Sequence, residues 1–191
     1  MFKKSLLALT SLATLGLANP ANATVLDFDS YADKTILAVG TFDSIGVHFN
    51  ETLQVNSGNI GDLPQSLPNT AVNFDSFGGN ITGFFLGPVT SVDFISVFAG
   101  DEGFDTDTVT LNGFDSLNNL VDTDTFTDVA AQTLSIFGAG IVRFEIIQTG
   151  AIAIDDFTFN PNNVPEPAPL ALLGLGLAGL GLSRRRTQKP G

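Results

Sequence analysis

The chain has 191 residues, a formal net charge of −12, one histidine and no cysteine. A chain without cysteine forms no disulfide and has no thiol chemistry. Between residues 24 and 163, the two basic residues Lys34 and Arg143 stand against nineteen acidic ones, so this part carries a net charge of −17. A surface with so much negative charge repels phosphate backbones, which excludes nucleic acid as a partner and favours cations.

The first 23 residues have the three parts of a secretory signal peptide, in order. Lys3 and Lys4 form a short basic region, residues 6–18 form an apolar stretch, and Ala21 and Ala23 frame a small-residue cleavage site. The apolar stretch is too short for a comfortable membrane-spanning helix, so the pattern predicts an N-terminal signal helix and export. We expect signal peptidase to cut after Ala23.

Residues 24–160 form one predicted β-sandwich domain. Short runs rich in β-branched and aromatic residues alternate with turns rich in Gly, Asn and Asp, and no run has sustained helical periodicity. We therefore expect an all-β fold, an antiparallel jelly roll or β-sandwich, with a hairpin turn at residues 115–119 and a central strand at residues 89–98. The expected strands are 25–29, 45–49, 52–55, 70–74, 81–86, 89–98, 108–111, 120–126, 134–137, 141–147 and 151–159.

The aromatic composition favours packing over recognition. The chain has 17 phenylalanines, a single tyrosine and no tryptophan. Phe fills a core without a polar group, whereas Tyr and Trp are the usual aromatic residues of binding surfaces. The triplet Phe-Asp-Ser begins at Phe28, Phe42, Phe74 and Phe114. These intervals are uneven, so we expect no structural repeat; instead Phe anchors a strand end in the core while Asp and Ser start a turn.

In the last expected strand, the apolar positions break the period of two. Ile152 and Ile154 share one face, and Phe157 and Phe159 continue that face after a step of three. This spacing predicts a β-bulge at Asp155-Asp156. Carboxylates that a bulge re-aims are suitable Ca²⁺ ligands, because calcium takes several hard oxygens. The alternative is that such carboxylates are solvated and prevent strand pairing at the sheet edge.

Two other acidic pairs bear on metal binding. Asp101 and Glu102, in a turn between two glycines, form a second candidate Ca²⁺ site. Asp122 and Asp124 lack the Gly and the terminal Glu of an EF-hand loop, so this motif is rejected.

A Pro-rich linker, residues 161–168, follows the domain and contains Val164, Pro165, Glu166 and Pro167. Residues 169–186 are the expected C-terminal short transmembrane helix with a basic end. The apolar run, residues 168–182, gives about 22 Å of helix against a hydrocarbon core of roughly 30 Å. It therefore spans a membrane only with local thinning or with snorkelling side chains.

Two features of this helix bear on its role. A stripe of small residues permits close approach of another helix, and it consists of Ala171, Gly174, Ala178 and Gly181. The alternative is a generic Gly- and Leu-rich anchor. A basic cluster stays cytoplasmic and stops the helix, which leaves the acidic domain outside; it consists of Arg184, Arg185 and Arg186.

The Pro-Glu-Pro element, the Leu/Gly/Ala helix and the arginine cluster together resemble the PEP-CTERM sorting signal of Gram-negative bacteria. The resemblance implies processing by an exosortase, a membrane protease-transpeptidase, in a host that makes exopolysaccharide and forms biofilms. It implies an inner-membrane intermediate, followed by delivery to the cell surface or extracellular matrix. The resemblance covers the last 28 residues and carries no information on the chemistry of the domain.

The domain also resembles the Phe- and Asp-rich jelly rolls often found ahead of this tail, since residues 155–159 match their usual closing strand. In galactose-binding-like jelly rolls, the first and last strands lie near each other and share a Ca²⁺ site. This resemblance implies a site that pairs Asp27 or Asp29 with Asp155 or Asp156.

Three functions were weighed for the domain. The leading hypothesis is a non-enzymatic structural or adhesive protein of the cell surface or matrix, associated with exopolysaccharide. The second is a carbohydrate-binding module for the host polysaccharide, against which the lack of Trp counts. A secreted hydrolase ranks last, because His48 is the single histidine and the sequence has no Gly-x-Ser-x-Gly elbow or zinc-ligand spacing.

Overall fold

The computed structural model describes residues 23–57, 68–76, 79–100, 106–150 and 152–161. The predicted signal helix, Asp101 and Glu102, and the linker and sorting helix from residue 162 onward lie outside the described residues. Within the described ranges, no helix has the length and apolar character needed to cross a membrane.

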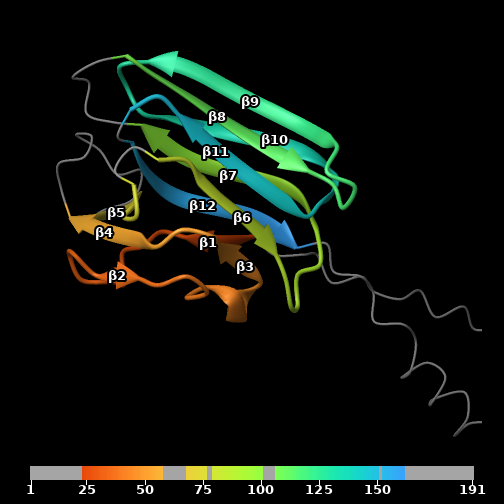
Figure 1. Cartoon of the computed structure of the whole chain (residues 1–191), viewed down its shortest axis with the longest axis horizontal. Helices are drawn as coiled ribbons and strands as arrows, with labels where there is room; N and C mark the ends of the chain where they lie inside the picture. Colours follow the sequence, from red (N-terminus) through yellow and green to blue (C-terminus); the bar gives the residue numbers. More distant parts are fainter. Residues whose placement is uncertain (1–22, 58–67, 77–78, 101–105, 151, 162–191) are drawn as a thin grey trace, which may run out of the picture.

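Two antiparallel sheets pack face to face as a β-sandwich (Figure 1). One sheet has the strand order β10-β7-β12-β5-β4-β2, with β1 paired to β12. Its seven strands are β1 (Thr24–Leu26), β2 (Ile36–Leu37), β4 (Leu53–Ser57), β5 (Asn69–Asn73), β7 (Val92–Gly100), β10 (Gln132–Ile141) and β12 (Ala153–Pro161). The other sheet has the order β3-β6-β11-β8-β9. Its strands are β3 (Val47–Phe49), β6 (Ile81–Phe85), β8 (Asp107–Phe114), β9 (Leu120–Asp128) and β11 (Arg143–Gln148).

This architecture confirms the all-β antiparallel sandwich expected from the sequence. The long apolar strand β7 lies inside its sheet, between β10 and β12, as expected of a central strand. β8 and β9 form the predicted hairpin.

Phenylalanines from both sheets meet in the core. The ring centroids of Phe49, Phe144 and Phe157 lie 5.5 Å (Phe49–Phe144), 5.4 Å (Phe49–Phe157) and 4.8 Å (Phe144–Phe157) apart. The three side chains come from β3, β11 and β12 and are at most 3% exposed. Tilted and edge-to-face rings of this kind add to the energy of burial. Phe has no polar atom, so this packing leaves no buried donor or acceptor without a partner.

The predicted bulge in the last strand is confirmed. Between Asp155 and Thr158, β12 advances three residues while its partner β7 advances two. Asp156, in the extra position, has a φ of 45°. The extra residue keeps Ile154 and Phe157 both in the core, where neither is exposed.

Three aspartates of β9, here called the aspartate ladder, close one open side of the sandwich. β9 and β10 are the edge strands of the two sheets on that side. The three acceptor–donor pairs, each 2.8 Å apart, are Asp122 Oδ2 with Phe137 N, Asp124 Oδ2 with Ser135 N, and Asp128 Oδ2 with Gln132 Nε2. An edge strand with unpaired N–H groups can template aggregation. The ladder gives the backbone N–H groups of Ser135 and Phe137 on β10 an acceptor.

The β8–β9 turn is held by one carboxylate. Asp115 Oδ1 accepts hydrogen bonds from the backbone N–H groups of Leu117 at 2.9 Å and Asn119 at 2.8 Å, and Oδ2 accepts one from the Asn119 amide at 2.9 Å. These hydrogen bonds hold the pKa of Asp115 below its usual value, and the bond from the Asn119 side chain contributes most.

Some local expectations were wrong. Ile45 does not begin a strand, because Asp43–Ile45 form a short 3₁₀ helix that ends at Gly46 with φ of 95°. β2 was not expected, since two residues are too few to show a period. The Phe of the Phe-Asp-Ser triplet is buried, as expected, at Phe28 and Phe42, which are 2% and 8% exposed, but not at Phe74, which is 45% exposed. Phe42 precedes the 3₁₀ helix and does not end a strand.

Candidate functional site

The first and last strands are neighbours, as the predicted calcium site requires. β1 pairs antiparallel with β12, and Leu26 lies opposite Phe157. Asp27 and Asp156 are therefore the next residues of the two strands in the same direction along the pair. The fold thus brings part of the predicted ligand set to one place.

The oxygens of these aspartates bind backbone N–H groups. Asp27 Oδ1 accepts from Asp29 N at 3.1 Å, and Asp29 Oδ1 accepts from Asn69 N at 2.9 Å. Asp155 is fully buried, and its Oδ1 accepts from Asp156 N at 2.8 Å. In the described part of the chain, no three His, Asp or Glu side chains are grouped so that they could hold a metal ion. The calcium site stays a prediction.

The same use of carboxylates recurs across the domain. Three more carboxylates each accept a hydrogen bond from a backbone N–H group at 2.8 Å: Asp33 from Ser57, Asp75 from Thr52, and Glu51 from Thr82. The bond from Ser57, helped by the charge of Lys34, holds the pKa of Asp33 below its usual value. Charge-assisted bonds are stronger than neutral ones. These carboxylates therefore act as structural acceptors of backbone hydrogen bonds. The alternative of a solvated edge carboxylate is wrong for Asp155, because Asp155 is fully buried and β12 lies between β7 and β5 inside its sheet.

Asp93, at the start of β7, is used differently. Its carboxylate takes part in no hydrogen bond or ion pair within the described ranges. It lines a hollow of about 440 Å³, here called the Phe137 hollow, whose other lining residues are Phe94, Phe137, Gly138, Ala139 and Asn160. The rings of Phe94 and Phe137 lie directly across the β7–β10 pair, with centroids 5.0 Å apart and planes tilted by 40°. Phe137 is 62% exposed.

Irregular pairing on both sides of β7 shapes this hollow. Between its pairs with Phe137 and Ile141 of β10, β7 advances two residues and β10 advances four. Between its pairs with Phe159 and Pro161 of β12, β7 advances three residues and β12 advances two. Bulges change the direction of side chains and are frequent beside functional sites. Here they leave Asp93 exposed and Phe94 only half-buried.

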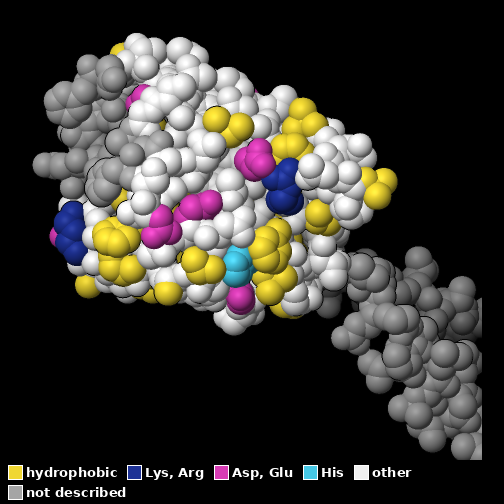
Figure 2. Space-filling view, in the orientation of Figure 1, with side chains coloured by type: hydrophobic (Ala, Val, Ile, Leu, Met, Phe, Trp, Pro, Cys, Tyr) yellow, Lys and Arg dark blue, Asp and Glu magenta, His cyan; other side chains and the backbone are white. Residues whose placement is uncertain are grey.

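The outer face of the five-stranded sheet carries a row of stacked side chains. His48, Phe84, Arg143 and Phe114 are successive partners in the register across β3, β6, β11 and β8. The rings of His48 and Phe84 stack with centroids 4.6 Å apart, and the Arg143 guanidinium carbon lies 3.9 Å from the centroid of Phe114. In Figure 2 the histidine lies between hydrophobic side chains and a carboxylate. That carboxylate is Asp43, whose Oδ1 is 2.7 Å from His48 Nδ1.

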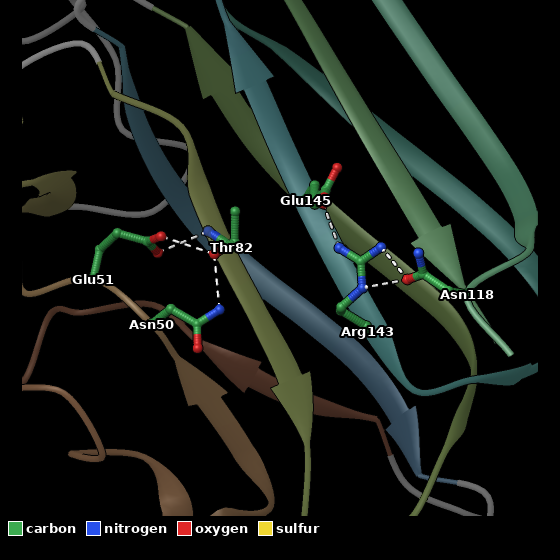
Figure 3. Close-up of polar contacts among 6 residues, drawn as sticks. All are labelled: Asn50, Glu51, Thr82, Asn118, Arg143 and Glu145. Carbon is green, nitrogen blue, oxygen red and sulfur yellow. Dashed lines mark hydrogen bonds and ion pairs between the residues drawn. The ribbon is translucent and has the colours of Figure 1, made fainter. Parts of the chain in front are cut away.

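Arg143 is held by two partners on this face (Figure 3). It forms an ion pair with Glu145, two residues along its own strand, where side chains point to the same face. Asn118 Oδ1, in the β8–β9 turn, accepts from Arg143 Nε at 3.2 Å and Nη2 at 2.7 Å. The one arginine of residues 24–163 is therefore used to tie the turn to the sheet.

A second network in Figure 3 ties the segment after β3 to β6. Thr82 Oγ1 donates to Glu51 Oε1 and accepts from Asn50 Nδ2, both at 2.8 Å. Glu51 Oε2 also accepts from Thr82 N at 2.8 Å. These bonds tie the loop between β3 and β4 to β6.

Among the described residues, His48 is not paired with a hydroxyl nucleophile. The hydrogen bond of His48 goes to Asp43. A general base needs its nucleophile within hydrogen-bond reach. The chemistry available in the Phe137 hollow is stacking and hydrogen bonding.

The C-terminal segment supplies a separate kind of site. Residues 163–186 match the family model described as the PEP-CTERM protein-sorting motif. The chain carries a PEP-CTERM sorting signal. The matched residues include Val164, Pro165, Glu166 and Pro167 and the three arginines up to Arg186, which confirms the resemblance found in the sequence. The motif implies export, processing by an exosortase and sorting to the surface.

No match to the sequence is found among curated proteins. Among solved structures, the sandwich is similar to the K2 cleaved adhesin domain of Lys-gingipain, with 11% identity, 72% of this chain and 97% of that chain covered, and a TM-score of 0.47. It is also similar to an arabinose-bound GH51 α-L-arabinofuranosidase, with 12% identity, 76% and 27% covered, and a TM-score of 0.45.

A third similar structure is the CBM22-1–GH10 part of Clostridium thermocellum xylanase 10B, complexed with xylohexaose. It has 15% identity, 72% of this chain and 30% of that chain covered, and a TM-score of 0.38. The chain therefore spans less than a third of each of the two enzymes. Likeness at this level bears on the fold alone and not on a ligand.

The Phe137 hollow was not predicted from the sequence. Its residues Asp93 and Phe94 lie in the expected strand 89–98, and Phe137 ends the expected strand 134–137. A signal was present, because Val92 and Ile95 are both fully buried although they stand three positions apart. The outward-facing Phe94 is also apolar, so it hid the break in the period of two.

Proposed function

We propose that the protein is a non-enzymatic structural or adhesive component of the cell surface or extracellular matrix, delivered by its sorting tail. The observation that carries the proposal is the sorting motif joined to a sandwich whose carboxylates accept backbone hydrogen bonds at turns and edges. Such a domain keeps its edge strands from pairing with other copies at the high concentrations of a matrix. Its strong negative charge keeps it soluble.

The finer description of the fold belongs to the same proposal. From β5 to β12 the chain crosses to the other sheet at every step except the β8–β9 hairpin. This alternation is typical of jelly rolls. The proposal places the domain in an exopolysaccharide-producing, biofilm-forming host, with bound Ca²⁺ as an added stabilising ligand.

The test uses the native host and the full chain with a tag inside the exported part. The wild type is expected at the surface with its tail processed, and the Glu166→Ala variant is expected to remain full-length in the inner membrane. Gln188→Ala, beyond the arginine cluster, serves as the control. Surface delivery of Glu166→Ala at the wild-type level would contradict this use of the motif.

The structural role is tested by floc cohesion. Deletion of the chain is expected to weaken cohesion of the flocs, and both the wild type and the His48→Gln variant are expected to restore it. A stable, surface-delivered His48→Gln that fails to restore cohesion would favour an enzyme instead.

A second candidate function is carbohydrate binding, and the Phe137 hollow favours it. The hollow combines an exposed aromatic ring with a carboxylate that no other described group engages. The low content of Tyr and Trp argues against a large stacking surface, but one sugar ring needs only one platform.

A further inference from the structure

We infer that the Phe137 hollow is a binding subsite for one uncharged pyranose ring of a polysaccharide. The inference deepens the second candidate function and rests on it. The hollow lies on the seven-stranded sheet where β7, β10 and β12 meet, and its volume of about 440 Å³ is within the range of small-molecule sites.

The aromatic part of the subsite is Phe137, supported by Phe94. At 62% exposed, Phe137 is more exposed than the exposed phenylalanines Phe74 and Phe84, at 45% and 38%. Phe94 packs against one side of it, with centroids 5.0 Å apart, and so restricts its rotation. The C–H face of a pyranose is apolar and covers such a ring, which removes the exposed apolar area from water.

The aromatic groups of the opposite sheet do not offer the same platform. The ring of Phe84 stacks on His48 at 4.6 Å, and that of Phe114 is covered by the Arg143 guanidinium at 3.9 Å. Both rings are also less accessible than Phe137: Phe84 is 38% exposed against 62% for Phe137, and Phe114 is only partly exposed. This contrast locates the sugar on the seven-stranded sheet.

The polar part of the subsite is Asp93 with Asn160. Neither side chain has a hydrogen bond to another described group. The carboxylate accepts from two sugar hydroxyls, and the amide both donates and accepts. These groups fix the orientation of a ring that the phenylalanine holds by its face, as in other small-molecule sites.

The charge of the domain selects an uncharged glycan. Residues 24–163 carry a net charge of −17, and Asp93 adds a carboxylate inside the hollow itself. A uronate or sulfate group would be repelled by both the local and the summed field. The hydroxyl groups of a neutral sugar meet no such barrier.

The experiment measures glycan binding by the full-length chain in a detergent without a sugar headgroup. Isothermal titration calorimetry measures the binding of three probes, cellohexaose, xylohexaose and mannohexaose. At least one probe is expected to bind, and Phe137→Ala and Asp93→Ala are each expected to weaken that binding by about tenfold, the worth of one aromatic contact or one charged hydrogen bond. Phe74→Ala removes an exposed phenylalanine outside the hollow and is expected to bind like the wild type.

The inference is overturned if none of the three probes binds the wild type. It is also overturned if Phe137→Ala, with an unchanged melting temperature, binds as tightly as Phe74→Ala, or if Phe84→Ala on the other sheet causes the loss instead. Surface delivery of Phe137→Ala in the native host is expected to equal that of the wild type. Failure of sugar binding would therefore leave the proposed surface role intact.

Discussion

The aspartate ladder gives the most direct test of how the sandwich is stabilised. Asp124 contributes two bonds, because Oδ2 accepts from Ser135 N at 2.8 Å and Oδ1 accepts from Thr125 N at 2.9 Å. Substitution of Asp124 by alanine removes the acceptor on β9 and leaves the N–H of Ser135 on β10 without it. Ser135 N is partly buried, so water replaces the lost acceptor only in part.

The expected loss follows from the charge-assisted hydrogen bond to Ser135 N, because the bond from Thr125 N is exposed and water replaces it. Such a bond contributes about 1.5 to 3 kcal/mol, and an unsatisfied, partly buried donor costs a similar amount. We therefore expect Asp124→Ala to lower the free energy of unfolding by about 2 kcal/mol. For a domain of this size, that loss lowers Tm by roughly 5 to 10 °C.

The assay is thermal and urea unfolding of the full-length chain, followed by circular dichroism. Asp93→Ala is the matched control, because it removes the same charge from a side chain without a described hydrogen bond. Loss of one negative charge from this acidic domain relieves repulsion in both variants, so the difference between them isolates the bond. The Asp122→Ala/Asp124→Ala double variant is also expected to increase light scattering, since β10 then exposes two edge N–H groups.

Equal stabilities of Asp124→Ala and Asp93→Ala, within about 0.5 kcal/mol, would contradict this role of the ladder. In that case water satisfies the β10 edge, and the ladder contributes nothing to the closure of the sandwich.

Three other measurements test separate parts of the structure. Gly83→Ala places a Cβ against the Phe144 ring and the backbone oxygen of His48, so we expect urea unfolding to show a loss of about 2 kcal/mol or more; a wild-type midpoint would contradict this packing. Hydrogen bonds lower the pKa of Asp115 from 3.8. The stability advantage of the wild type over Asp115→Asn should therefore be full above pH 3.8 and disappear as the pH falls through the lowered pKa. An advantage that does not depend on pH would contradict this role of the carboxylate. Millimolar Ca²⁺ is expected to raise the melting temperature if the predicted site at Asp27 and Asp156 forms, and an unchanged midpoint would remove it.

Much of the fold could be predicted from local patterns. The bulge at Asp155-Asp156 was visible because Ile154 and Phe157 are separated by three residues instead of two. The hairpin turn at Asp115 was visible because Asp and Asn residues gather between two alternating runs. The sorting signal was visible because three physical features follow each other in one short segment. Each of these signals is contained in a few consecutive residues.

The polar and aromatic contacts between distant strands were not visible in this way. The bond from Ser135 to Asp124 and the stack of His48 on Phe84 depend on which residues face each other in the register. Register between distant strands is set by the packing of the whole core, and a shift by one residue would turn every side chain to the other face.

The sequence by itself determined the all-β class and the export and sorting of the chain, because strand periodicity and the terminal signals are local properties. Only the tertiary structure decided which of the described carboxylates serve the backbone and that Asp93 has no such partner among the described groups. Asp93, Phe137 and Asn160 come from three strands and meet only where the pairing of β7 becomes irregular on both sides. Because these residues lie far apart in the sequence, no local pattern predicts that they come together.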